Sequence, residues 1–179
     1  MPTVLVPLAD GFEEIEALAP VDLLRRAGVE VKTVSLAETR HATGRSGITV
    51  HADATLESVR GTLADLLFIP GGAGVKHLRA DARVAELVRA HAAADRWLAA
   101  ICAGPLVLHD AGLLAGRRYT AHFSVAAELT EARLEERIVT DGRVTTARGA
   151  GTAVEFGLHL VALLTSPGEA TEISKAICL

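Results

Sequence analysis

Apolar, strand-like runs alternate with helical stretches along almost the whole chain, and this alternation constrains the fold more than any other feature. Successive parallel strands need crossover connections, usually helices, and these connections are right-handed. The pattern therefore predicts an α/β protein. We expect a flavodoxin-like, doubly wound sandwich in which a mostly parallel sheet carries helices on both faces.

The expected elements follow from hydrophobic periodicity and from turn signals. Buried or half-buried strands are predicted at Thr3–Leu8, Glu30–Leu36, Asp65–Pro70, Trp97–Ile101 and Tyr119–His122. Helices are predicted at Glu13–Ala27, Asp81–Ala94, from about Gly104-Pro105 onward, at Thr152–Thr165 and at Gly168–Ile177. Two hairpins are expected, a small side hairpin within residues 40–55 and one over residues 137–148 that turns at Asp141-Gly142. Asp10 and Glu13 stand at capping-box spacing, and Gly28 is placed to end the first helix.

Composition limits the class of protein. The chain has 179 residues, half of them apolar, which suits one core and a single domain over residues 1–179. Its net charge of −4, scattered arginines and scarce aromatic residues argue against a nucleic-acid partner. No basic signal segment and no apolar run of membrane-spanning length is present, so we expect a cytoplasmic protein with no membrane partner.

The cysteines and histidines offer no obvious metal site. Cys102 and Cys178 are the two cysteines, so neither a disulfide framework nor a CxxC-type cluster is expected. The seven histidines are dispersed, and none pairs with another at the spacing of helical metal ligands. We therefore expect no metal and no cofactor.

Cys102 follows the apolar strand Trp97–Ile101 and precedes a helix that starts near Gly104-Pro105. A sharp strand-to-helix turn of this kind lifts one side chain above the carboxyl edge of a parallel sheet. The unpaired N–H groups of the following helix favour negative charge, which predicts that the thiol is biased towards the reactive thiolate. The alternative is a small buried hydrophobe, the usual role of a free cysteine.

Glu16 shares a helical stripe with Pro20, Leu23 and Ala27, so periodicity turns its carboxyl group towards apolar surroundings. Burial raises the pKa of a carboxyl group, and the protonated acid can then donate a hydrogen bond to a thiolate. Alternatively, Glu16 is a solvated acid of the first helical turn, which is a common arrangement.

Two further features are expected at the same edge of the sheet. Gly71-Gly72 follows a strand, and glycines let backbone N–H groups approach a bound oxygen closely, as an oxyanion hole requires. His122 ends the predicted strand after the Cys102 helix and could act as an acid or base. The alternatives are an ordinary strand-to-helix turn and a structural histidine.

Five segments, in order along the chain, together resemble the ThiJ/PfpI superfamily. Within it they are similar to the DJ-1 branch, that of the parkinsonism-associated protein deglycase and its bacterial relatives. The segments are Gly11–Ala17 (GFEEIEA), Pro20–Gly28 (PVDLLRRAG), Ile69–Gly72 (IPGG), Ala100–Pro105 (AICAGP) and Arg148–Thr152 (RGAGT). The resemblance implies the fold of the class I glutamine amidotransferases.

The resemblance also implies roles for individual residues. Cys102 would be the nucleophilic, oxidation-prone cysteine, and Glu16 would be the acid that bonds to its sulfur. The N–H groups of Gly72 and Ala103 would form the oxyanion hole, with His122 as the nearby imidazole. The peptidase-like members have a histidine where this chain has Ala103, so a protease triad is not expected.

Arg26 corresponds to an arginine that lies near the active site across the dimer interface in this branch, which implies a homodimer. A second interface arginine of the branch has no match, because Ser46, beside Arg45, stands at its position.

The resemblance implies a cysteine-dependent enzyme that protects against carbonyl and oxidative stress. Its expected substrates are small aldehydes or glycated adducts, handled either by a glutathione-independent glyoxalase (a lyase) or by a deglycase (a hydrolase). The main alternative is a non-enzymatic redox sensor or stress chaperone that uses oxidation of Cys102. A role in thiamine-precursor synthesis has no thiazole-binding or kinase motif to support it.

Overall fold

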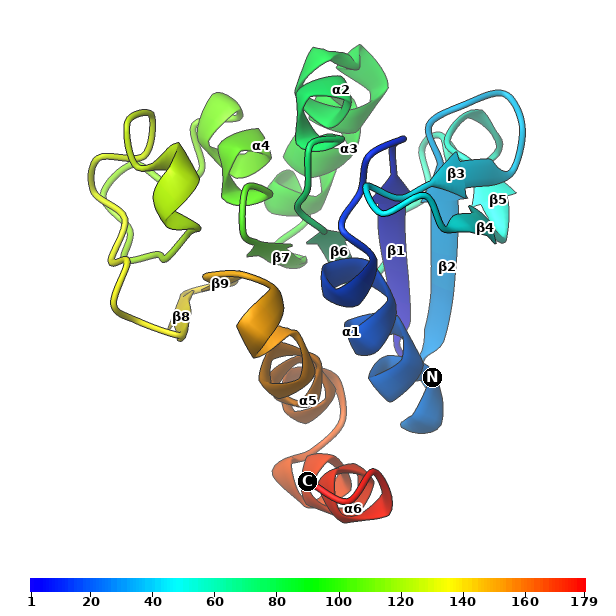
Figure 1. Cartoon of the computed structure of the whole chain (residues 1–179), viewed down its shortest axis with the longest axis vertical. Coiled ribbons are helices and arrows are strands. Elements are labelled where there is room, and N and C mark those ends of the chain that lie inside the picture. The colour runs from blue at the N-terminus through cyan, green and yellow to red at the C-terminus, as the bar shows by residue number, and fades with distance from the viewer.

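The central sheet of the computed structural model, which describes all 179 residues, has seven strands in the order β5-β2-β1-β6-β7-β9-β8 (Figure 1). Every neighbouring pair is parallel except β8 and β9, which form the antiparallel hairpin predicted at Asp141-Gly142. The strands are β1 (Thr3–Leu8), β2 (Glu30–Ser35), β5 (Ala54–Thr55), β6 (Leu66–Ile69), β7 (Trp97–Ile101), β8 (Ile138–Asp141) and β9 (Val144–Ala147). The mostly parallel sheet confirms the expected α/β class.

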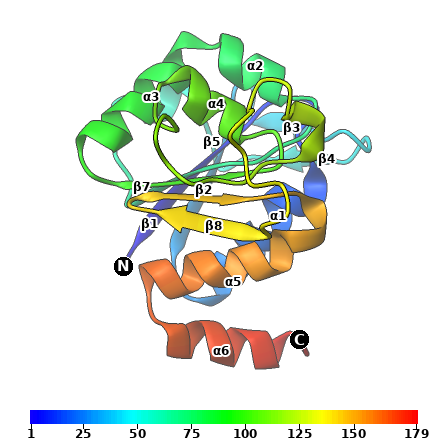
Figure 2. The ribbon, with the colours of Figure 1, turned by 90° about the vertical axis from the view of Figure 1, so that its left-hand side faces the viewer.

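Helices cover both faces of the sheet, as Figure 2 shows in side view. One face carries α2 (Val75–Ala80), α3 (Ala82–Ala93) and α4 (Pro105–Asp110), and the other carries α1 (Glu14–Arg26) and α5 (Ala153–Leu164). The last helix, α6 (Pro167–Ala176), packs outside α5. None of these helices is both long and apolar enough to span a membrane.

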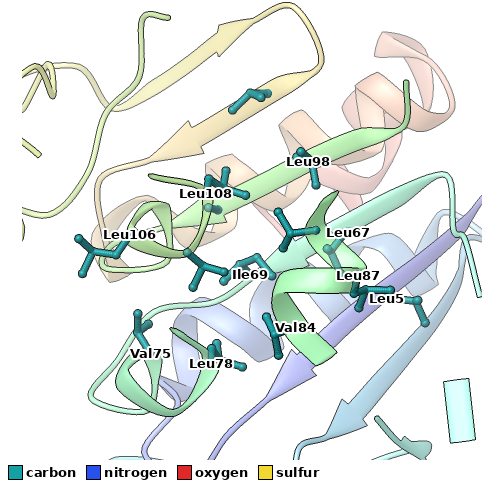
Figure 3. Close-up of a cluster of buried hydrophobic side chains, with 14 of the residues drawn as sticks. Leu5, Leu67, Ile69, Val75, Leu78, Val84, Leu87, Leu98, Leu106 and Leu108 are labelled. Carbon is teal, nitrogen blue, oxygen red and sulfur yellow. The ribbon is translucent and has the colours of Figure 1, made fainter. Parts of the chain in front are cut away.

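Two hydrophobic clusters fill the spaces between the sheet and its helices, one on each face. Alternate residues of a strand point to opposite faces, so Leu67 joins the cluster under α3 while Leu66 and Phe68 join the cluster under α1 and α5. Figure 3 shows the first cluster, in which Leu5 and Leu67 lie with Leu87 of α3. Because both faces are buried, the central strands β6 and β7 are apolar throughout.

The predicted strand at Tyr119–His122 is wrong. The backbone N–H of Thr120 donates to the side-chain Oγ1 of Thr146 (2.8 Å), and the N–H of His122 donates to the carbonyl oxygen of Cys102 (2.9 Å). These isolated bonds go to a side chain and to the turn at Cys102, so the segment forms no ladder with a strand and is not part of the sheet.

The start of α1 also differs from expectation. Glu13 is the N-cap, and its Oε2 accepts a hydrogen bond from the N–H of Glu16 (2.7 Å). Asp10 instead accepts from the N–H of Thr43 (2.9 Å), which attaches the side hairpin of β3 (His41–Thr43) and β4 (Thr49–His51) to the loop after β1. The helix ends at Arg26, shortly before Gly28.

The six residues of α2 were not predicted as a helix, because so short a segment carries little periodicity. The remaining predicted helices are confirmed to within a few residues.

Candidate functional site

Cys102 occupies a sharp turn between β7 and α4, as its sequence context predicts. Its φ of 63° lies in the left-handed region that residues other than glycine rarely adopt. Its N–H donates to the carbonyl oxygen of Ala147 on β9 (2.9 Å), so the turn is held against the neighbouring strand. A strained backbone at this point is typical of a residue placed for chemistry.

Glu16 is buried, with 2% of its surface exposed, as the apolar stripe predicts. Its Oε2 has no hydrogen bond of normal length and angle. The thiol of Cys102 and the amides of Gly71 and Ala150 face this carboxyl group and act on it as nearby dipoles. Gly71 lies against both side chains, and a Cβ there would overlap Glu16 Oε2 and lie 2.7 Å from Cys102 Cβ.

Burial raises the pKa of the Glu16 carboxyl from 4.5 to about 7. Removal from water disfavours the ionised form, and the nearby charge of Glu13 adds to this effect, while the facing thiol and the two amides oppose it. Glu16 therefore exchanges a proton near neutral pH, which suits a group that both donates and accepts protons.

The thiol of Cys102 does not behave as its position before a helix predicts. Burial and, after it, the negative charge of the facing Glu16 together raise its pKa from 9.0 to about 12, against the opposing effect of the amides of Ala103 and Gly72. The helix that follows has only six residues, so its dipole is small. Ionisation of Cys102 therefore depends on the protonation state of Glu16.

The amides of Gly72 and Ala103 both face the sulfur of Cys102, where they favour negative charge. Gly72 has a φ of 94°, a conformation that glycine adopts without strain. An isolated bridge to Phe12, and a hydrogen bond from the N–H of Glu13 to the carbonyl oxygen of Gly71 (3.0 Å), hold this turn against the start of α1. Two fixed donors beside a nucleophile can stabilise an oxyanion.

His122 reaches the site through the backbone bond to Cys102 described above. It begins the short 3₁₀ turn η2 (Phe123–Val125), where its Nδ1 accepts from the N–H of Ser124 (3.3 Å) and lies 2.8 Å from Ser124 Oγ. With Nδ1 as an acceptor, the proton of the neutral ring is on Nε2, which is then a donor. The ring of Phe123 lies beside it, with centroids 4.1 Å apart.

A pocket of about 570 Å³ adjoins the site at His122. Besides His122 it is lined by Phe123, Arg137, Arg148 and the glycine-rich turn η3 (Ala150–Thr152). Arg148 donates to the carbonyl oxygen of Glu135 (3.4 Å) and has no ion pair, whereas Arg137 pairs with Glu155. No sequence pattern points to Phe123 or Arg137, and Arg148 belongs only to the segment RGAGT.

Arg26 and Ser46 lie outside this cluster. Arg26 points outward from α1 and pairs with Asp22 (2.8 Å). The N–H of Ser46 donates to Glu14 Oε1 (2.8 Å), which fastens the hairpin turn to the start of α1. The dimer-interface role of Arg26 stays a prediction. No group of three or more His, Cys, Asp or Glu side chains in the chain could hold a metal ion.

Comparison with known proteins gives consistent results. The profile of the DJ-1/PfpI family matches residues 2–163. The glutathione-independent glyoxalase DJR-1.2 of Caenorhabditis elegans is 34% identical over 98% of this chain and 95% of its own length. DJ-1 homolog B of Arabidopsis thaliana is 33% identical over 98% of this chain but 41% of its own length, so this chain spans less than half of that relative.

Solved structures agree with the fold described above. The structure of Drosophila melanogaster DJ-1beta superposes with a TM-score of 0.96 at 30% identity, covering 99% of this chain and 98% of that one. The oxidized DJ-1 of Toxoplasma gondii superposes with a TM-score of 0.94 at 33% identity, with the same coverage.

Proposed function

Because the chain belongs to the DJ-1/PfpI family, we propose that it is a cysteine-dependent enzyme that acts on small reactive carbonyls. The observation that carries this proposal is the pairing of the Cys102 thiol with the buried carboxyl of Glu16, beside the two amides of Gly72 and Ala103. The glyoxalase activity named for the C. elegans relative supports the same substrate class.

In the proposed reaction, the ionised Glu16 accepts the thiol proton as the sulfur of Cys102 forms a bond to the aldehyde carbon. The carbonyl π electrons move to oxygen, and the amides of Gly72 and Ala103 donate hydrogen bonds to this oxyanion. Glu16 then returns the proton to the oxygen, which completes a hemithioacetal. A pKa near 7 allows Glu16 to perform both transfers at neutral pH.

With methylglyoxal, the hemithioacetal next loses its C1 proton to Glu16, and the π electrons of the C2 carbonyl move to its oxygen, which gives an enediolate. His122 donates its Nε2 proton to the oxygen on C2 and takes the proton of the C1 hydroxyl group. Glu16 then returns its proton to C2 as the C1 carbonyl forms. The product is a lactoyl thioester on Cys102. Water hydrolyses the thioester to lactate and restores the thiol, so methylglyoxal and water give lactate and one proton. Deglycation of early aldehyde adducts would use the same attack on carbon.

The test is an assay of lactate formed from methylglyoxal without glutathione. The unmodified protein should form lactate, Cys102→Ser should form none, and Cys178→Ser, at the exposed cysteine, should match the unmodified protein. Absence of lactate with the unmodified protein, or equal turnover by Cys102→Ser, would contradict the proposal.

A redox sensor is the second candidate, and it is favoured by the oxidized state of the T. gondii relative. Peroxide would convert the Cys102 thiol to sulfenic acid, and a second peroxide to sulfinic acid, each releasing water. Mass spectrometry after dilute peroxide treatment separates the two functions. Sulfinic acid at Cys102 in a protein that forms no lactate would favour the sensor.

We also propose that the chain forms a homodimer through the outward face of α1. Ile15 on α1, Ile48 on the side hairpin and Val154 at the start of α5 are exposed apolar residues. Arg26 lies on the same helix and lines a groove with Val154. Self-association would bury these apolar side chains.

A further inference from the structure

A small cavity of about 190 Å³ lies between α3 and the loop that joins the 3₁₀ turn η1 (Glu57–Val59) to β6. Its apolar lining consists of Leu56, Val59, Leu63, Leu87 and Ala90. Three of these, Leu56, Val59 and Leu87, belong to the hydrophobic cluster on this face of the sheet. Because α3 covers the face opposite to α1 and α5 (Figure 2), the cavity is separate from the proposed dimer surface.

Both walls of the cavity are held in place. On the loop side, Gly61 has a φ of 77°, a conformation that glycine adopts without strain. The N–H of Thr62 donates to the carbonyl oxygen of Val59 (2.9 Å), and the N–H of Ala64 donates to Nε2 of the buried His91 (3.1 Å). Since His91 belongs to α3, the loop is bonded to the helix that forms the other wall. A preformed cavity binds a ligand with little loss of conformational freedom.

The volume of the cavity fits one six-membered ring. An engineered apolar cavity of about 150 Å³ in another protein binds benzene. The cavity beside α3, with about 190 Å³, therefore accommodates a phenyl ring and the carbon that links it to a polar group. Its apolar walls favour a ligand that buries such a ring.

Opposite charges stand on the two walls. Arg60 on the loop and Glu86 on α3 both line the cavity and form an ion pair, with 3.3 Å between Nη2 and Oε2. Glu57 lies farther from Arg60, at 3.9 Å. The third charged residue of the lining, Arg83, donates two hydrogen bonds to Asp81 (3.0 and 2.7 Å), which neutralises its charge. Arg60 and Glu86 are each more than half exposed, and such ion pairs contribute little stability, so this pair opens readily.

We propose that the cavity binds a free α-amino acid whose apolar side chain is about the size of that of phenylalanine. The ring lies among the apolar walls, the α-carboxylate accepts hydrogen bonds from Arg60, and the α-ammonium group donates to Glu86. A ligand with only one charge would separate the ion pair and leave Arg60 or Glu86 without a partner, so the paired charges favour a zwitterion. This site is independent of the proposed enzymatic function.

Calorimetric titration of the full chain with L-phenylalanine tests the site. One molecule should bind per chain, with a dissociation constant on the order of 1 mM or tighter for a ligand of this size. Ala90→Leu fills the cavity from α3 and should abolish binding. Ala93→Leu adds the same side chain at an exposed position of α3 that does not line the cavity, and it should bind L-phenylalanine unchanged.

Charge variants and truncated ligands test the recognition of the two charges. Arg60→Gln should weaken the binding of L-phenylalanine about tenfold but should not weaken that of phenethylamine, which lacks the carboxylate. Glu86→Gln should weaken the binding of L-phenylalanine to a similar extent but should not weaken that of phenylpropionate, which lacks the ammonium group. In the unmodified protein, both truncated ligands should bind more weakly than L-phenylalanine.

Thermal unfolding completes the test. L-phenylalanine should raise the melting temperature of the unmodified protein and of Ala93→Leu, but not that of Ala90→Leu. No saturable binding at about 10 mM L-phenylalanine, or equal affinity in Ala90→Leu and the unmodified protein, would overturn the proposal. Equal affinities of the unmodified protein for L-phenylalanine and both truncated ligands would overturn the assignment of a zwitterion.

Discussion

Gly71 lies so close to Cys102 that a methyl group on it would come within 2.7 Å of Cys102 Cβ. The same methyl group would overlap Oε2 of Glu16 and lie 2.9 Å from the carbonyl oxygen of Ile101. A side chain at this position would therefore have to displace both reacting groups. The backbone of Gly71 sets the distance between the acid and the thiol.

Gly71→Ala should reduce aldehyde turnover, by up to about a hundredfold, because a misplacement of about 1 Å is enough to disturb a reacting geometry. The overpacked site should also lower the free energy of unfolding by about 1–3 kcal/mol. Steady-state kinetics and urea unfolding measure these effects. Gly168→Ala, at an uncrowded position on α6, should leave turnover unchanged and should not lower the free energy of unfolding. Full activity in Gly71→Ala would show that the contact is unimportant.

Glu16→Gln should lower the pKa of the Cys102 thiol from about 12, because it removes the negative charge that is the second cause of the rise. The pKa should stay above 9.0, since burial, the largest cause, remains. The measurement is the rate of alkylation against pH in a Cys178→Ala background. Asp22→Asn, at an exposed acid on the same helix, should leave the profile unchanged. An identical profile in Glu16→Gln would mean that the carboxylate does not act on the sulfur.

The stability of the protein should depend on Glu16 between about pH 4.5 and 7. In this range the folded state keeps a proton on Glu16 that the unfolded state has released, so stability falls as the pH rises. A shift from 4.5 to about 7 corresponds to a loss on the order of 3 kcal/mol. Urea unfolding of Glu16→Gln should lack this loss. If the free energies of unfolding of Glu16→Gln and the unmodified protein differ by the same amount from pH 4.5 to 8, the carboxyl group of Glu16 is solvated.

His91 should produce the opposite pH dependence. It is fully buried in α3, accepts from the N–H of Ala64 at Nε2 (3.1 Å) and lies 2.8 Å from the carbonyl oxygen of Leu87 at Nδ1. Burial lowers the pKa of His91 below 6.5, with a further small effect of Arg96, while the bond to Leu87 opposes this change.

The unfolded chain therefore binds a proton first as the pH falls below about 6.5, and the folded state loses stability. His91→Leu should lower the free energy of unfolding by about 1–3 kcal/mol at pH 7.5, because the N–H of Ala64 is left without a partner. When the pH is lowered, the stability of this variant should fall less than that of the unmodified protein. Urea unfolding from pH 7.5 to 5 measures both effects, with His77→Leu as the exposed control. If His91→Leu and the unmodified protein lose the same stability between pH 7.5 and 5, His91 is not the cause of that loss.

The proposed homodimer can be tested at Ile15, which is 55% exposed on the outward face of α1. Ile15→Glu should convert a dimer to a monomer in sedimentation velocity at micromolar concentration, because a charge would be buried without a partner. Leu63→Glu, at an exposed leucine of the loop before β6, should remain dimeric. A monomeric unmodified protein would refute the interface.

Local sequence pattern was sufficient to predict the strand-helix alternation and the turn at Cys102, and it left the burial of Glu16 as one of two alternatives. Each of these depends on residues a few positions apart, whose periodicity determines which face of a strand or helix is buried. The failures at Asp10 and at Tyr119–His122 have the opposite origin. In both cases the hydrogen-bond partners come from distant parts of the chain. Asp10 bonds to Thr43, and the segment 119–122 bonds to Thr146 and Cys102.

The chemistry of the site was decided by tertiary structure. The sequence placed Cys102 before a helix and so predicted an acidic thiol, but burial and the facing carboxyl of Glu16 raise its pKa instead. Likewise, Arg60 and Glu86 are far apart in the sequence, and only the packing of α3 against the loop before β6 makes them neighbours. Electrostatic interactions and ligand geometry depend on distances through space, and these distances are set when the sheet and the helices pack together.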